Sequence, residues 1–410
     1  MHKSLLIKGI LLLWLQGFFV LSEAHGKDVV TPPPHAANQL LLMDTTTGEV
    51  LVEKNADLSM IPSSMTKILT AYVVFMKLRE GQLTLDQKLP VSEKAAKTES
   101  SWLLREGART MVSVRDLIKA VIVVSGNDAS VVLAEGIAGS EEKFGKLLTE
   151  VAHKMGATHT HFLNSSGLPE EGHRTTAKDL AIISLRLMKD FPEYYHLFGE
   201  SQFVYDNASY DSTNLPLFEK GIGVDGIKTG RTKAAGFGVV ASAVQKGRRL
   251  LLVLNGLSSN EERAEVSEQM LRWGFAHFDT QLIANKGQLI DHLPVVNGEQ
   301  EHVAVQPVQD IWVTLPHVAK SKAKALLRFD SPLVAPLVAQ QQVAQLVIQV
   351  PGREDKVYSL YAAAAIEKAN FFRRMYRYIH HVFLGDTFVS KSIQTVGQHN
   401  IHESTSQFEG

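Results

Sequence analysis

Three short motifs bring together the side chains that serine acyl transfer requires. They are Ser64–Lys67 (Ser-Met-Thr-Lys), Ser125–Asn127 (Ser-Gly-Asn) and Lys228–Gly230 (Lys-Thr-Gly). Together they supply a hydroxyl nucleophile, a lysine that can act as its base, a second hydroxyl with an amide, and a fixed cation. This set can transfer an acyl group through serine without a histidine.

Neither serine motif is specific when it stands alone. Ser-x-x-Lys starts at Ser64, Ser140 and Ser321, and Ser-x-Asn starts at Ser125, Ser212 and Ser258, whereas Lys-Thr-Gly occurs once. The prediction therefore depends on order and local context. Ser140 begins a charged stretch that is typical of a helix cap.

The first motif is expected to lie at the start of a helix. Pro62 precedes it, apolar residues at helical spacing follow it, and Gly81 closes the pattern. Residues i and i+3 share a helix face, so Lys67 would lie beside Ser64. Burial and a second cation, Lys228, would lower the Lys67 pKa far enough for it to act as a base. The plainer interpretation is a capping serine with a solvated lysine.

The other two motifs could surround the same point. Ser125 and Asn127 follow an apolar run, where a hydroxyl could pass a proton to the leaving group and a carboxamide could hold a substrate carbonyl. Lys228 and Thr229 are predicted to begin an edge strand and to hold a substrate carboxylate, with Gly230 allowing the substrate backbone to approach. The alternatives are an ordinary turn and a lysine that protects a sheet edge.

The elements around the motifs predict an α/β (α+β) fold with an antiparallel sheet and helices. Residues 39–52 resemble a hairpin, residues 114–189 are mainly helical apart from a turn at 164–169, residues 224–257 form strands, and residues 261–278 form a helix. We expect a catalytic domain over residues 37–280. A small all-β domain should follow at 282–362, because short Val- and Leu-rich runs there alternate with turns.

The segment 366–384 is predicted to be an amphipathic helix that lies on a membrane surface. One face is aromatic and aliphatic, and the opposite face carries Arg373, Arg374 and Arg377. The alternative is a helix docked on the β domain, in which case the arginines would need acidic neighbours. The polar residues 386–410 are expected to be a disordered tail.

The N-terminus predicts export. An apolar run whose start is flanked by Lys3 and Lys8 ends at Ser22-Glu23-Ala24, which indicates a signal peptide over residues 1–24, followed by a linker over 25–36. An uncleaved anchor helix is the alternative. A net charge of −1 gives no reason to expect nucleic acid as a partner. The chain has no cysteine, and its sixteen histidines show no metal-binding spacing, so neither a metal nor another cofactor is expected.

The three motifs resemble those of the penicillin-recognising serine acyltransferases. Further stretches are similar to the D-alanyl-D-alanine carboxypeptidases, the low-molecular-mass penicillin-binding proteins, among them 164–168, 176–181 and 271–275. The resemblance covers about residues 37–384. It implies an antiparallel sheet with helices on both faces and an all-helical lobe, followed by the β domain and the C-terminal helix.

The resemblance also implies residue roles. Ser64 would be the acylated nucleophile, Lys67 its proton acceptor, and Ser125 and Asn127 the rest of the catalytic set. The substrate carboxylate would be held by Lys228 and Thr229, with Arg263 close by. Arg231, where the family often has histidine, adds a cation, and its backbone N–H would form an oxyanion hole with that of Ser64.

The expected function is removal of the terminal D-Ala from peptidoglycan stem pentapeptides, with inhibition by β-lactams. It would take place at the periplasmic face of the bacterial inner membrane. A β-lactamase of the same superfamily is one alternative, although the Glu-x-x-Leu-Asn segment of class A enzymes is missing from the sequence. A non-catalytic periplasmic protein that binds cell-wall peptide is the other.

Overall fold

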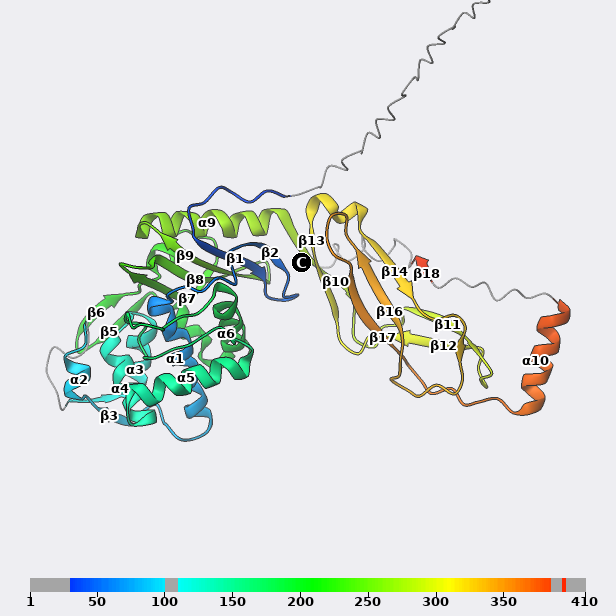
Figure 1. Cartoon of the computed structure of the whole chain (residues 1–410), viewed down its shortest axis with the longest axis horizontal. Coiled ribbons are helices and arrows are strands. Elements are labelled where there is room, and N and C mark those ends of the chain that lie inside the picture. The colour runs from blue at the N-terminus through cyan, green and yellow to red at the C-terminus, as the bar shows by residue number, and fades with distance from the viewer. Residues whose placement is uncertain (1–29, 100–109, 385–392, 396–410) are drawn as a thin grey trace, which may run out of the picture.

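A five-stranded antiparallel sheet forms the centre of the N-terminal part of the chain. The computed structural model describes residues 30–99, 110–384 and 393–395 (Figure 1). The strand order is β2-β1-β9-β8-β7. The strands are β1 (Gln39–Asp44), β2 (Val50–Lys54), β7 (Val224–Thr232), β8 (Gly236–Gln245) and β9 (Arg248–Leu257). The predicted hairpin and the predicted strands at 224–257 are confirmed.

Both faces of this sheet are apolar and covered by helices. Successive side chains of a strand point to opposite faces, so Leu41 packs in the core shared with α1 (Lys67–Arg79) and α6 (Ala177–Asp190). Leu40 packs on the other side, with α9 (Asn260–His277). Figure 1 shows α9 along one side of the sheet and α1 and α6 on the other. The α/β (α+β) fold with helices on both faces is confirmed.

A helical lobe extends from the α1 side. Its main helices are α3 (Val114–Ile122), α4 (Asn127–Ala138) and α5 (Glu141–Met155), and its shorter ones are α2 (Glu93–Ala96) and α7 (Pro192–Tyr195). Two small hairpins accompany them: β3 (Lys88–Pro90) with β4 (Met111–Ser113), and β5 (Gln202–Tyr205) with β6 (Ala208–Asp211). The short helix α8 (Leu215–Phe218) packs with α9 on the other side of the sheet. Ser140 caps α5 by accepting a hydrogen bond from the Lys143 amide, which confirms the capping interpretation of that Ser-x-x-Lys copy.

The C-terminal part is built from strands. A seven-stranded sheet has the order β15-β11-β12-β17-β16-β14-β18, and β10 pairs separately with β13. The strands are β10 (Phe278–Ala284), β11 (Asp291–Val296), β12 (His302–Gln306), β13 (Ile311–Pro316), β14 (Lys324–Arg328), β15 (Leu333–Val334), β16 (Gln342–Gln349), β17 (Lys356–Ala362) and β18 (Ile393–Thr395). Phe278 belongs to the core around α9 and Ala284 to the separate core of the β sheets, so the two cores meet along β10.

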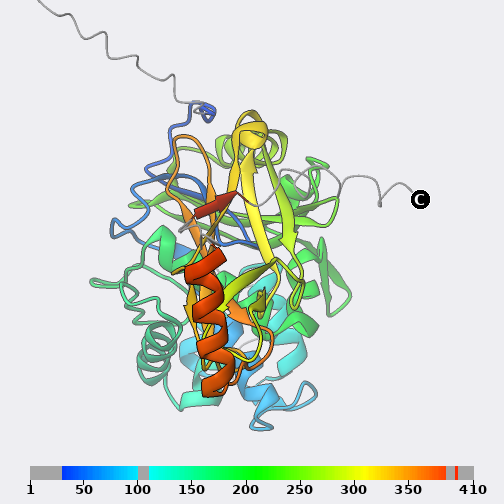
Figure 2. The same cartoon turned by 90° about the vertical axis from the view of Figure 1, so that its right-hand side faces the viewer.

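The predicted amphipathic helix is present as α10 (Phe371–Leu384), seen end to end in Figure 2. Its apolar side is uncovered, since Phe371 is 66% and Phe372 77% exposed. The opposite side touches the β domain: Arg377 Nε lies 3.1 Å from Glu301 Oε1, and Nη1 donates to Gly298 O at 2.6 Å. One arginine therefore finds the acidic neighbour that the docked alternative required, while the described apolar residues Phe371, Phe372 and Met375 remain exposed.

Of the helices formed by the described residues, none combines the length and the apolar character needed to cross a bilayer. The expected signal peptide (1–24), part of the linker and most of the expected tail lie outside those residues. Within the tail, Ile393–Thr395 pairs with Leu326–Arg328 as β18. The expectation of disorder throughout residues 386–410 is therefore wrong for these three residues, because the free edge of β14 can pair with an extended segment.

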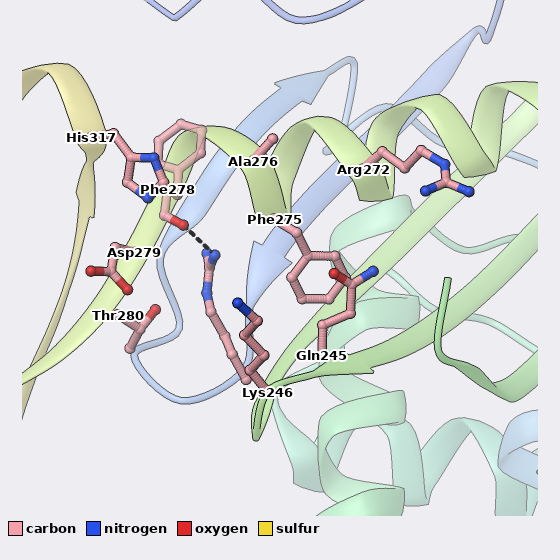
Figure 3. Close-up of a pocket in the computed structure, with 10 residues that line it drawn as sticks. Gln245, Lys246, Arg272, Phe275, Ala276, Phe278, Asp279, Thr280 and His317 are labelled. Carbon is pink, nitrogen blue, oxygen red and sulfur yellow. Dashed lines mark hydrogen bonds between the residues drawn. The ribbon is translucent and has the colours of Figure 1, made fainter. Parts of the chain in front are cut away.

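The two parts of the molecule are joined through Asp44, a buried residue of β1 that contacts both the central sheet and β10. Asp44 Oδ2 lies 2.7 Å from Arg248 Nε and accepts a hydrogen bond from Thr280 Oγ1 at 2.6 Å. A pocket of 480 Å³ adjoins this junction (Figure 3). Figure 3 shows Gln245 and Lys246 reaching from the β8–β9 turn toward the end of α9. No residue of the three sequence motifs lines this pocket.

Candidate active site

Ser64 and Lys67 lie on one turn of helix, as predicted. Ser64 is in the 3₁₀ helix η1 (Ser63–Thr66), which runs directly into α1 at Lys67. Lys67 Nζ lies 3.2 Å from Ser64 Oγ. A lysine amine and a serine hydroxyl are therefore in hydrogen-bond contact at the start of a buried helix.

Asn127 and the loop around Ser166 hold the Lys67 amine from two other directions. Nζ is 2.6 Å from Asn127 Oδ1 and 2.7 Å from the carbonyl oxygen of Ser166. Both of these oxygens can only accept. A neutral amine has two hydrogens and one lone pair, so both hydrogens are used here and the lone pair faces Ser64 Oγ.

Burial lowers the pKa of Lys67, so that the neutral form of its amine is populated near neutral pH. Lys67 is 1% exposed, and burial lowers its pKa from 10.5 to about 7 against the opposing charges of Asp128 and Glu141. The charge repulsion between Lys67 and Lys228 was expected to lower the Lys67 pKa. In the structure, this repulsion lowers the pKa of Lys228 instead. The pKa of Lys228 is well below its usual value because of burial first, and then the charges of Lys67 and Arg263.

The second motif lies between α3 and α4. Ser125 has a positive φ of 61°, and Asn127 is the first residue of α4. Asn127 was expected to hold a substrate carbonyl. In the structure its Oδ1 orients Lys67, and its Nδ2 donates to Glu99 O at 2.9 Å. The second hydrogen of Nδ2 is the one that could still reach a substrate.

The third motif lies within β7, the edge strand of the sheet. Its lysine and threonine were expected to begin the strand, but β7 starts four residues earlier, at Val224. The edge position is confirmed by the strand order. Lys228 is 1% exposed, and its Nζ donates to Thr229 O at 3.1 Å and to Thr213 Oγ1 at 3.3 Å.

Gly230 brings β7 against η1. A Cβ at this position would lie 3.0 Å from Pro62 O and 3.1 Å from Ser63 Cβ. Gly230 was expected to let the substrate backbone approach, but η1 occupies this side of the residue. The absence of a side chain at Gly230 therefore lets β7 pack beside Ser64. A hydrogen bond of 3.2 Å from Ser63 Oγ to Thr232 Oγ1 links the same two elements. Ser64 and Arg231 each lie one residue from this contact.

The two arginines differ in their surroundings. Arg231 is exposed, with its guanidinium 4.9 Å from the centre of the Phe237 ring. Arg263, on α9, is buried, and its Nη1 donates to Gly238 O at 3.3 Å and to Gly230 O at 3.4 Å. Burial lowers the pKa of Arg263 to about 10. Arg263 therefore reaches the third motif through backbone carbonyl groups and remains a cation at neutral pH.

The sequence analysis missed a set of residues that support the site. Thr213 accepts from Lys228, and Asn214 Nδ2 donates to Ile227 O at 3.0 Å, so the discarded Ser-x-Asn copy at Ser212 anchors β7. Glu141 accepts from Ser165 Oγ at 3.0 Å and so fixes the loop that binds Lys67. Spacing alone could not identify these residues, because they lie 13 to 24 residues from their partners, with no regular period between them.

Comparison with known proteins places these features in a family. The D-alanyl-D-alanine carboxypeptidase profile of peptidase family S11 matches residues 27–258, and the profile of the C-terminal domain of penicillin-binding protein 5 matches residues 278–368. The D-alanyl-D-alanine carboxypeptidase DacD of Escherichia coli (strain K12) is 34% identical over 358 residues, which cover 85% of this chain and 92% of the relative.

Solved structures agree with the sequence matches. Penicillin-binding protein 5 from Haemophilus influenzae is 33% identical, with a TM-score of 0.76 over 82% of this chain and 99% of that one. Penicillin-binding protein D2 from Listeria monocytogenes, in its ampicillin-bound form, is 30% identical, with a TM-score of 0.55 over 60% of this chain and 99% of that one. The chain belongs to the D-alanyl-D-alanine carboxypeptidase family, peptidase family S11.

Proposed function

We propose that this protein is a serine D-Ala-D-Ala carboxypeptidase that removes the terminal D-Ala from peptidoglycan stem pentapeptides. The observation that carries the proposal is the contact of 3.2 Å between Ser64 Oγ and the buried amine of Lys67. It occurs in a chain that belongs to the D-alanyl-D-alanine carboxypeptidase family.

Acylation begins with proton transfer from Ser64 to Lys67. Neutral Lys67 takes the hydroxyl proton as Oγ attacks the carbonyl carbon of the penultimate D-Ala. The negative oxygen that forms is bound by the backbone N–H groups of Ser64 and Arg231. The C–N bond then breaks, and the leaving amine receives a proton from Lys67 by way of the Ser125 hydroxyl. An ester on Ser64 and free D-Ala are the products.

Deacylation repeats these steps with water. Neutral Lys67 accepts a proton from a water molecule, which attacks the ester carbonyl, and the proton returns to Ser64 Oγ as the bond to the enzyme breaks. Asn127 and Ser166 hold the amine during both steps. The shortened peptide leaves with a new carboxylate.

Cations select the carboxylate end of the substrate. Lys228 and Thr229 on β7 bind the terminal carboxylate, and the charges of Arg231 and Arg263 lie around the same part of the strand. A β-lactam carries a carboxylate beside its reactive amide, so it would acylate Ser64 in place of the peptide. The ampicillin-bound Listeria relative supports this inhibitor class.

Two measurements on the purified protein test the proposal. Mass spectrometry after penicillin treatment should show one covalent adduct, and peptide mapping should place it on Ser64. A diacyl-D-Ala-D-Ala peptide should release D-Ala, and Ser64→Ala should lose both properties. An adduct with a half-life of seconds would favour the β-lactamase alternative. Labelling that persists in Ser64→Ala would exclude the nucleophile assignment.

We further propose that the protein acts at the periplasmic face of the inner membrane. The predicted N-terminal signal peptide and the basic, aromatic helix α10 support this location. With Phe371 and Phe372 exposed on one side and Arg377 held by the β domain on the other, α10 would present its apolar side to lipid. The β domain would then hold the catalytic domain away from the membrane surface.

A further inference from the structure

One buried histidine beneath the active site has no place in the mechanism above. His173 lies between the loop at 164–169 and α6, and it is 3% exposed. Its ring stacks on Phe162, with ring centres 4.9 Å apart and planes 7° from parallel. Packing therefore fixes the orientation of the imidazole.

Its hydrogen bonds determine where the ring carries its proton. The backbone N–H of Leu163 donates to Nδ1 at 3.1 Å, so Nδ1 must present a lone pair. The hydrogen of the neutral ring is therefore on Nε2, which lies 2.9 Å from Thr66 Oγ1. Thr66 Oγ1 in turn donates to the carbonyl oxygen of Ser63 at 2.9 Å. The result is a directional chain from Leu163 through His173 and Thr66 to Ser63.

This chain ends on the helix that carries the nucleophile. Ser63 and Thr66 are the first and last residues of η1, Ser64 lies between them, and Lys67 follows at once. Ser63 has a φ of 50°, an unfavourable value for a residue other than glycine, so its carbonyl needs a fixed partner. The Thr66 hydroxyl supplies that partner.

We propose that His173 is a positioning residue, which holds η1 through Thr66 and so keeps Ser64 Oγ within reach of Lys67 Nζ. The proposal rests on the function proposed above, because it concerns the readiness of Ser64 for acylation. Burial first, and then His161, lower the pKa of His173 to about 4, so the ring stays neutral where the enzyme would act. A proton added at Nδ1 would face the Leu163 N–H, and the chain would break.

The kinetic test compares Thr66→Val, His173→Phe and the double variant. Each single change should lower the second-order rate constant for acylation by fluorescent penicillin about tenfold, the effect of losing one oriented hydrogen bond. The double variant should be no slower than the slower single variant, because both changes break the same chain. The control is Thr160→Val, which removes a buried hydroxyl bonded to Thr175 and Asp179 and should acylate at the wild-type rate.

His173→Gln separates positioning from simple packing. Glutamine offers an acceptor and a donor and can restore part of the chain, whereas phenylalanine keeps the ring and its stack on Phe162. Positioning predicts faster acylation in His173→Gln than in His173→Phe, and packing predicts the reverse order. A folded His173→Phe variant that acylates at the wild-type rate would overturn the proposal, as would additive losses in the double variant.

Nitrogen-15 NMR of the histidine rings tests the chain without any enzymatic activity. The signals of His173 are identified as those missing from the spectrum of His173→Gln. At pH 7 they should show a neutral ring with hydrogen on Nε2, and Thr66→Val should shift the Nε2 signal. A charged ring, or hydrogen on Nδ1, would overturn the proposal. Failure of the proposed function would look different: the wild-type protein would form no adduct on Ser64 and release no D-Ala.

Discussion

The chemistry of single residues depends on how the Lys67 amine is surrounded. Three oxygens contact Nζ, and two of them can only accept, so the neutral amine has its lone pair toward Ser64. Burial brings the pKa to about 7. The same lysine on the surface would be charged and could not accept a proton.

Acylation by penicillin should therefore rise with pH through an apparent pKa of about 7. Only the neutral amine is a base, so well below this pKa the rate should fall about tenfold for each pH unit. The measurement is the second-order labelling rate from pH 5 to 9. Thermal unfolding over the same range is the control. Between pH 7 and 10.5, Lys67 is protonated in the unfolded chain but neutral in the folded protein. Its contribution to the free energy of unfolding therefore rises with pH over this range. A labelling rate that is flat from pH 5 to 8 would contradict the assignment of Lys67 as base.

At the scale of elements, the site depends on how closely β7 approaches η1. Gly230 permits this approach, and Thr213 and Asn214 hold β7 from the other direction. Local sequence explains each element, since η1 follows Pro62 and Gly81 ends the helical pattern of α1. Contacts between residues far apart in the chain set the distance between the elements.

Gly230→Ala should move β7 away from Ser64. The added methyl group would lie 3.0 Å from Pro62 O, so we expect at least a tenfold loss of acylation and about 1–3 kcal/mol of stability. Labelling rate and urea unfolding measure the two effects. Gly298→Ala is the control, because its added methyl group would lie 2.9 Å from Gln300 O, in the β domain and away from the three motifs. Unchanged acylation in folded Gly230→Ala would refute this role.

Helix α10 should bind lipid through its uncovered side. Replacing Phe372 and Met375, which are 77% and 45% exposed, by serine should lower binding to anionic vesicles at least tenfold and leave D-Ala release unchanged. Deletion of residues 366–410 should release the protein from membranes altogether. Val204→Ser, at a site 67% exposed on β5, is the matched control. Vesicle sedimentation measures the effect, and equal binding of both variants would refute the lipid-facing role of α10.

At the scale of the whole molecule, the two domains are tied together beside the pocket of Figure 3. Asp44 is fully buried, and it joins Arg248 of the central sheet to Thr280 at the start of the β domain. Glu49 forms a second tie, since it pairs with Arg353 at 2.6 Å and also with Lys356. Both ties start from the β1–β2 hairpin.

Asp44→Ala should destabilise the protein by about 3 kcal/mol, because it leaves the Arg248 guanidinium buried without its partner. Calorimetry should then show the two domains melting in separate steps. Asp86→Ala is the control: it removes an exposed pair with Arg115 and should change stability by less than about 1 kcal/mol. If the two substitutions lower the stability equally, the buried junction contributes no more than an exposed ion pair.

The sequence predicted much of this molecule because local patterns control local structure. The β1–β2 hairpin, the strands at 224–257 and helix α10 follow from apolar periodicity and turn residues. The prediction was wrong where packing decides: the η1 contact of Gly230 and the strand at residues 393–395. In each case the partner lies far away in the chain, so no spacing rule could reveal it.

By itself, the sequence determined the chemical groups and their order: two serines, two lysines and an amide in three motifs that identify the family. Only the tertiary structure decided what those groups can do. Burial shifts the Lys67 pKa, Asn127 and Ser166 direct the amine, and His173 and Gly230 set the place of η1. Acidity and alignment depend on solvent exclusion and on contacts between distant segments, and these exist only when the chain is folded.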